Sequence, residues 1–239
     1  MLGVFLFIKL SVFSSLQFGW SDTTATCQSL QLPASLFVER KANSTEPVYL
    51  LIGFAKSGHL AWIERARSVD GPEFWRLQVQ NLDQDKKDLT VDLWPEEDQE
   101  ITAANFCKAF SDSIDKSLAK FAIQPAKSLV PVPAGAQSAI AEVEIQKGTK
   151  DQNSQTLHTM IMKTTKGQKT LGTVRQVDPD TGQDPISAPK LVGLLKSPFE
   201  QRVAVLFYQE TQGAEATTNC ALQVFGSRLD KGWTPARSH

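Results

Sequence analysis

The sequence lacks the short motifs by which many enzymes and cofactor-binding proteins are recognised. It contains no G-x-S-x-G, the turn that presents the nucleophilic serine of many hydrolases. Residues 166–170 (KGQKT) lack the upstream glycine of a phosphate-binding loop. The three histidines, His59, His158 and His239, lie far apart in the chain. We therefore predict no catalytic residue from motifs, no bound cofactor and no metal site.

Cysteine is scarce. Cys27, Cys107 and Cys220 form no C-x-x-C and no cluster with histidine, which argues against a zinc site or a redox-active dithiol. Two of the three cysteines could form a disulfide, which leaves one thiol. Alternatively, all three are buried thiols. If a bridge forms, we favour Cys27–Cys107 over Cys107–Cys220, because a loose N-terminal segment gains most from tethering. A cysteine nucleophile paired with His59 or His158 stays open, since such pairs meet only in space. His59 lies in a predicted turn, so we expect it to face water.

An excess of either charge is also absent. The 25 Lys and Arg residues balance 26 Asp and Glu residues, for a net charge of −1. Nucleic-acid-binding proteins usually carry a basic patch, so we predict no nucleic-acid partner. Hydrophobic residues make up 41% of the chain and charged residues 21%, a balance that allows a packed core and argues against wholesale disorder.

The N-terminal stretch is the strongest signal that is present. Residues 1–20 are strongly apolar, and residues 21–26 are polar and small. This pattern resembles a secretory signal peptide. A membrane anchor is the rival interpretation, but Lys9 interrupts the run and its length barely spans a bilayer. We predict that residues 1–25 are a cleaved leader, that the protein is periplasmic or extracellular, and that it meets a membrane only through an uncleaved leader.

Strand-like patterns fill the first half of the mature chain. Residues 48–54 form a continuous apolar run, and residues 74–82 alternate between apolar and polar side chains. Residues 60–64 form a further strand, and residues 89–93 are a candidate fourth. Turn residues separate these runs, so the pattern predicts an antiparallel meander.

The hydrophobic period changes at residues 101–123. Apolar residues there recur at spacings of four or three, which predicts one stripe of an amphipathic helix packed on the sheet. Pro125 ends the helix. The stripe consists of Phe106, Phe110, Ile114, Leu118 and Phe121.

The second half is again strand-like, and part of it echoes the first. Residues 51–57 (LIGFAKS) match residues 191–197 (LVGLLKS), and each copy is followed by a turn and two more strands. This echo predicts two related meanders, with chance similarity of buried strands as the alternative. We therefore expect a mainly β (α+β) fold in which two antiparallel meanders pack as sheets with the helix between them, because each sheet has one apolar face to bury. Residues 26–239 form one domain, with halves at 26–129 and 136–239.

The stretch at residues 53–62 (GFAKSGHLAW) carries a resemblance to a known kind of repeat. It is similar to the opening of the β-meander units in propeller-type repeats, although Ser57 stands where those repeats usually have aspartate. Over about residues 45–228, the order of elements resembles a family of predicted secreted bacterial proteins of unknown function. The resemblance implies export and a β-rich fold, and it implies no chemistry.

Three tryptophans are the candidate binding residues. Trp62, Trp75 and Trp94 could line a groove, whereas tryptophans in strands more often lie in the core or in cross-strand pairs. Trp62 shares its strand face with Leu60, which favours burial. The sequence as a whole favours a non-enzymatic binding or interaction module, with an unknown ligand or an envelope protein as its partner. A hydrolase whose catalytic residues assemble only in three dimensions is the alternative.

Overall fold

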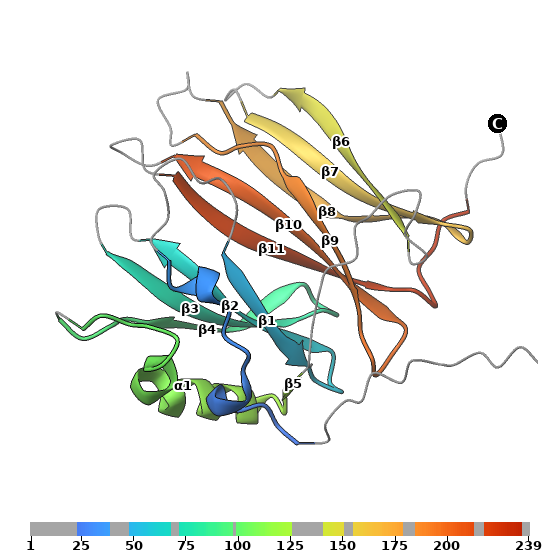
Figure 1. Ribbon diagram of the computed structural model, residues 1–239. Coiled ribbons are helices and arrows are strands. Elements are labelled where there is room, and N and C mark those ends of the chain that lie inside the picture. Colours follow the sequence, from blue (N-terminus) through green and yellow to red (C-terminus); the bar gives the residue numbers. More distant parts are fainter. Residues whose placement is uncertain are drawn as a thin grey trace, which may run out of the picture.

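The computed structural model (Figure 1) describes residues 23–38, 48–67, 72–97, 99–125, 141–150, 155–178, 185–212 and 218–235. These residues form three antiparallel sheets and one α-helix, so the predicted mainly β fold is confirmed. The first sheet has the order β4-β3-β2-β1-β5, the second β11-β10-β9 and the third β6-β7-β8. The elements are β1 (Tyr49–Phe54), β2 (His59–Arg67), β3 (Glu73–Asn81), β4 (Lys86–Leu93), α1 (Phe106–Lys120), β5 (Gln124–Pro125), β6 (Glu142–Lys150), β7 (Gln155–Thr164), β8 (Gly167–Val177), β9 (Lys190–Lys196), β10 (Arg202–Gln212) and β11 (Thr218–Arg228).

The elements stack in layers, from α1 through the first and second sheets to the third (Figure 1). One apolar core lies between α1 and the first sheet, another between the first and second sheets, and another between the second and third. The second half of the chain thus supplies two meanders, one more than the sequence prediction counted. Alternation within a strand marks a sheet face but does not say which strands pair with one another.

The central strand β2 of the first sheet is buried on both faces. Every residue of β2 from residue 59 to residue 65 is buried, with Ala61 and Ile63 facing α1 and with Leu60 and Trp62 facing the second sheet. The expectation that each sheet buries one apolar face is therefore wrong for this sheet. Helix and sheet cover it from opposite sides, so β2 needs apolar side chains at successive positions.

Helix α1 buries the predicted stripe. Phe106, Phe110, Ile114 and Leu118 are buried against the first sheet. The helix is shorter than the range 101–123 because Asn105 holds the preceding residues in a turn, accepting the Thr102 N–H at 2.7 Å. Residues beyond the helix join the sheet at β5, which pairs with β1.

The disulfide joins Cys27 to Cys107, with 5.5 Å between their Cα atoms, and confirms the favoured pairing. It fixes residues 23–38 over the core between α1 and the first sheet. The Ala25 N–H donates to the Ile123 carbonyl at 2.7 Å, and the Trp75 indole N–H donates to the Leu36 carbonyl at 3.0 Å. The N-terminal segment is therefore part of the domain rather than a loose tail.

The sequence echo corresponds to a shared strand geometry. The pairing of β1 with β2 skips Ile52, and the pairing of β9 with β10 skips Val192. In each copy the skipped residue directly precedes a glycine, Gly53 or Gly193. A bulge at the same position in both meanders shows that the similarity extends to register, which chance use of apolar residues does not explain.

Corresponding faces of the two meanders point the same way along the stack. Trp62, opposite Leu51, corresponds to Phe207, opposite Leu191. Trp62 lies in the core between the first and second sheets, and Phe207 lies in the core between the second and third. The meander of β9–β11 therefore has the same orientation as the meander that begins with β1, and it lies one layer further along the stack.

Polar side chains of the first sheet and of its β3–β4 turn protect the open edge of β11. Gln80 donates its amide to the Val224 carbonyl at 2.7 Å, Glu64 accepts the Leu222 N–H at 3.4 Å, and Asp85 accepts the Gly226 N–H at 2.5 Å. Burial raises the pKa of Asp85 even though this amide bond acts in the opposite direction. Unpaired strand edges invite association with other chains, so this capping closes one such edge.

Candidate functional site

The structure separates the three candidate tryptophans. Trp62 is fully buried and Trp75 is 5% exposed, so both are core residues. Trp94 directly follows β4 and is 46% exposed. Among the three, Trp94 is the one that a ligand or partner protein can reach.

Trp94 belongs to a surface that we call the Trp94 ledge, formed by Phe74, Arg76, Asp92 and Trp94. The indole stacks on the Phe74 ring with 4.0 Å between centroids and 23° between planes. The Arg76 guanidinium lies 5.0 Å from the centroid of the same ring. Phe74 is covered by these two side chains and is only 3% exposed, so it supports the exposed indole from below.

The charged part of the ledge is an ion pair. Arg76 Nε lies 2.6 Å from Asp92 Oδ1, and Arg76 Nη2 donates to Asp92 Oδ2 at 3.1 Å. This two-point hydrogen bonding to Asp92 raises the pKa of Arg76. About a third of each side chain stays exposed, so the remaining N–H groups and oxygen lone pairs are available to a ligand. The ledge is an aromatic face beside a neutral polar pair.

The ledge lies at one end of the face that the first sheet turns toward the second. Phe74 pairs with Ala66, Arg76 with Glu64, and Gln78 with Trp62 along neighbouring rows. The core between the first and second sheets contains Trp62 and residues of β9, β10 and β11. Phe74 is not part of this core. The first sheet therefore extends past its cover, which leaves the ledge open.

His59 occupies a second candidate site. The sequence predicted a water-facing turn residue, but His59 begins β2 and is 9% exposed. Its Nδ1 lies 2.9 Å from Ser57 Oγ, and its Nε2 lies 3.0 Å from Asp88 Oδ2. The ring also packs on Phe121 with 4.9 Å between centroids. The expectation of a solvated histidine is wrong because β4 and the end of α1 both cover the turn.

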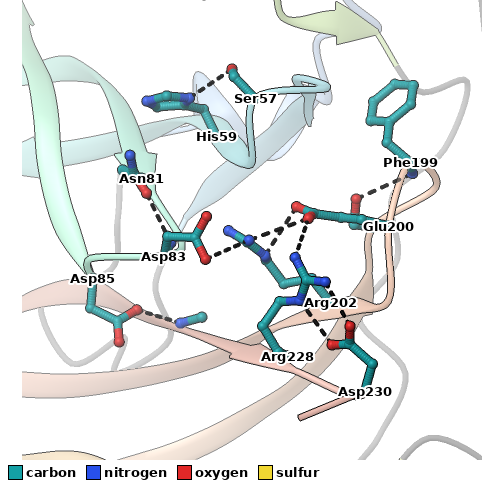
Figure 2. Close-up of polar contacts among 12 residues, drawn as sticks. Ser57, His59, Asn81, Asp83, Asp85, Phe199, Glu200, Arg202, Arg228 and Asp230 are labelled. Carbon is teal, nitrogen blue, oxygen red and sulfur yellow. Dashed lines mark hydrogen bonds and ion pairs between the residues drawn. The ribbon is translucent and has the colours of Figure 1, made fainter. Parts of the chain in front are cut away.

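An ionic network joins the first and second sheets next to this histidine (Figure 2). Arg202 is 1% exposed, and its guanidinium lies 2.6 Å from Asp83 and 3.0 Å from Glu200. Arg228 bridges Glu200 and Asp230, and their hydrogen bonds raise the pKa of Arg228 and lower that of Asp230. Because Arg202 is enclosed, this network serves as a structural joint rather than a ligand site.

The remaining histidine in the described part of the chain, His158, lies between the second and third sheets. It is 4% exposed, and its Nε2 is 2.7 Å from Gln176 Oε1. Gln176 also lines a pocket of about 180 Å³. Two other lining groups are already engaged, since Ser187 accepts the Glu210 N–H and the Glu210 carboxylate pairs with Lys190. The pocket gives weaker grounds for a ligand than the ledge does.

The disulfide removes two of the three candidate cysteine nucleophiles. Cys107 is in the disulfide, and Cys220 is a buried thiol outside it. Among the described residues, no group of three or more His, Cys, Asp and Glu side chains is arranged to hold a metal ion. In the same part of the chain, no helix has the length and apolar character needed to cross a membrane.

Comparisons with known protein families, with curated proteins and with solved structures found no match. The class of protein is thus defined by its architecture, a layered stack of antiparallel meanders with a helix on one face and an aromatic ledge at the open end of the first sheet.

Proposed function

We infer that this chain is exported and works as a binding module whose partner packs on the Trp94 ledge. The observation that carries the proposal is the Trp94 side chain, 46% exposed yet held in place by stacking on Phe74. A preordered aromatic side chain loses little conformational entropy when a partner covers it. Tryptophan and arginine are also the residues that most often dominate binding energies.

The ledge favours a partner without a large charge. Arg76 and Asp92 neutralise each other, so the ledge presents hydrogen-bonding groups of both kinds but no net field. A partner that places a flat apolar group on the indole and polar groups over the ion pair would satisfy both parts. This division into an apolar centre and a polar rim is typical of protein interfaces.

Export is supported by the disulfide. Stable disulfides are found mainly in oxidising compartments, such as the periplasm and the extracellular space. The Cys27–Cys107 bridge closes over a core that includes Ala25, Cys27 and Leu36. Residues 1–22, which contain most of the proposed leader, lie outside the described residues.

The buried Ala25 moves the proposed end of the leader from residue 25 to a position before it, so that Ala25 stays in the mature protein. Ala25 is 1% exposed and its N–H bonds to Ile123, so a chain beginning after Ala25 would lose a main-chain contact of the fold. Mass spectrometry of the N-terminal peptide of the secreted protein is expected to show a start between Ser21 and Ala25. Recovery of intact Met1 on a cytosolic protein would contradict export.

The ledge is tested with a photo-crosslinker in the host cell. Thr90 is exposed on the same sheet face as Asp92 and Trp94, so p-benzoylphenylalanine at this position keeps the ledge intact. We expect irradiation to give a discrete adduct, and Trp94→Ala to reduce its yield at least tenfold. Loss of a binding hot spot weakens affinity by about 2 kcal/mol or more, which corresponds to roughly 30-fold.

The matched control places the crosslinker at Leu157, which is 51% exposed on the third sheet. The crosslinker at Leu157 should not give the adduct that is obtained from Thr90. The same product from both positions, or a product that survives Trp94→Ala in a folded variant, would show that the ledge is not the binding surface. Circular dichroism of each variant establishes that the fold is retained.

A further inference from the structure

Three side chains meet at the β1–β2 turn, two from the turn itself and one from β4. Ser57 Oγ, His59 Nδ1, His59 Nε2 and Asp88 Oδ2 form a continuous chain with contacts of 2.9 and 3.0 Å. Ser57 and Asp88 are both exposed residues, although the side chains of His59 and Asp88 are only 11% and 26% exposed. The serine hydroxyl therefore lies at an accessible end of the chain, with the histidine enclosed behind it. Figure 2 shows Ser57 and His59 at the end of the turn.

The local backbone explains this placement. Gly58 adopts φ of +83° and donates its N–H to the Ala55 carbonyl at 3.0 Å, which closes a tight turn. The turn points Ser57 outward and makes His59 the first residue of β2. The His59 side chain, two residues after Ser57, can then reach back to the serine hydroxyl.

Asp88 reaches the histidine because it is a bulged residue. In the pairing of β3 with β4, Val79 lies opposite Leu89 and Gln80 lies opposite Lys87, so Asp88 is the extra residue between them. Bulges redirect side chains and occur often next to active sites. The irregularity in β4 thus falls at the residue that contacts His59.

The bonding pattern fixes which atoms carry protons. An ionised Asp88 carboxylate only accepts hydrogen bonds, so His59 Nε2 must donate to it. In a neutral imidazole the other nitrogen, Nδ1, is then an acceptor, and the Ser57 hydroxyl donates to it. This is the arrangement of an activated serine, with a base on the hydroxyl and a carboxylate orienting the base. The two ring nitrogens have exchanged roles relative to the common hydrolytic triad.

We propose that Ser57, His59 and Asp88 form an acyl-transfer site that hydrolyses exposed, activated esters. Ser57 Oγ attacks the ester carbonyl carbon while His59 Nδ1 takes the hydroxyl proton, and the imidazolium returns that proton to the departing alcohol. Water then attacks the acyl-serine, with His59 again accepting a proton and returning it to Ser57. The products are an acid and an alcohol, and no other reactant is needed.

Two neighbours stabilise the charged intermediate state of His59. Asp88 is a positioning residue that holds Nε2–H and balances the positive imidazolium. Phe121, the C-cap of α1, packs on the ring, so the imidazolium forms at the C-terminal end of a helix. The partial negative charge of a helix C-terminus favours a cation there.

The same geometry limits the rate and the substrate class. The Gly58 N–H, which follows the serine, is bonded to Ala55 and does not face a developing oxyanion. Removal of one oxyanion donor lowers kcat by about 10²–10³ in a serine protease. We therefore expect slow turnover, restricted to esters with good leaving groups such as phenols. The site is distinct from the Trp94 ledge. Ala66 pairs with Phe74 of the ledge, and Ala66 lies about 23 Å from His59 along β2.

The experiment uses a fluorophosphonate probe and p-nitrophenyl acetate with the full mature chain. We expect peptide mapping to find the probe on Ser57, and Ser57→Ala to abolish both labelling and hydrolysis above background. Asp88→Asn should lower kcat about 10³–10⁴-fold with little change in KM, because the amide favours the wrong imidazole tautomer. Ser29→Ala, at another exposed serine, should change neither readout.

Thermal unfolding separates catalysis from a structural role of the same contacts. The amide introduced by Asp88→Asn can still hydrogen-bond to His59 Nε2, with the amide N–H donating in the wrong tautomer, so the melting temperature of this variant should stay close to that of the native protein while kcat falls. An unlabelled Ser57, or equal hydrolysis by Ser57→Ala and the native chain, overturns the proposal. The photo-crosslink at the ledge is independent of Ser57, so either proposal can fail alone.

Discussion

Removing the disulfide with the double substitution Cys27→Ala and Cys107→Ala is expected to lower the free energy of unfolding by about 4–5 kcal/mol. The bridge joins residues 80 apart in the sequence, and the chain-entropy model gives this magnitude for a loop of that length. Domains are stable by only about 5–15 kcal/mol, so the variant would lose a large fraction of its stability. Urea unfolding followed by circular dichroism measures the change.

The control for this prediction is Cys220→Ala. Cys220 is 7% exposed and outside the disulfide, so its replacement removes a buried sulfur but closes or opens no loop. We expect a loss of about 1–2 kcal/mol, since losing a few buried atoms is a local packing effect. A double variant that is no less stable than Cys220→Ala would mean that the N-terminal segment holds its place without the bridge.

The sequence predicted those features of the fold that depend on short-range periodicity. Runs at residues 48–54 and 74–82 correspond closely to β1 and β3, and the stripe from Phe106 to Leu118 is the buried face of α1. Period and turn residues are local properties, so they can be read without knowing the partner strands. The repeat at residues 191–197 was equally visible and corresponds to β9.

The order of the layers could not be predicted in the same way. Strands β9–β11 lie next to the first sheet, although β6–β8 come earlier in the chain. Glu64 illustrates the consequence for single residues. A glutamate in a strand would be placed at the surface, yet Glu64 is 5% exposed because it accepts the amides of Gln78 and Leu222. Those partners are set by packing between sheets rather than by local sequence.

The candidate sites likewise depend partly on local sequence and partly on packing between distant segments. Each tryptophan lies in a strand-like run or directly after one, and the extent of the second sheet distinguishes buried Trp62 from exposed Trp94. The serine and histidine of the further site are two residues apart in a visible turn signal. Asp88 lies 29 residues beyond His59 and reaches it through a bulge, which has no marker such as glycine in the local sequence.

The second large effect concerns Trp62, the bulky residue at the centre of the core between the first and second sheets. Trp62→Ala is expected to lower the free energy of unfolding by about 3–5 kcal/mol, the usual range for removing a large buried aromatic side chain. The side chain is fully buried and packs with residues of both sheets, including Leu60, Leu206 and Leu222. Few of these neighbours can move to fill the cavity, because they belong to paired strands.

Trp62→Phe should cost far less, about 1.5 kcal/mol or below, for two reasons. Among the described residues the buried Trp62 indole N–H has no hydrogen-bond partner, and an unpaired buried donor carries a penalty of about 1–3 kcal/mol that phenylalanine removes. The corresponding position of the second meander already uses Phe207, on a strand with the same bulged register. Urea unfolding of Trp62→Ala, Trp62→Phe and Phe207→Ala tests both points together. Equal losses for the two Trp62 variants would show that the indole N–H is satisfied in solution, and a small loss for Phe207→Ala would show that the two meanders do not share a packing role at this position.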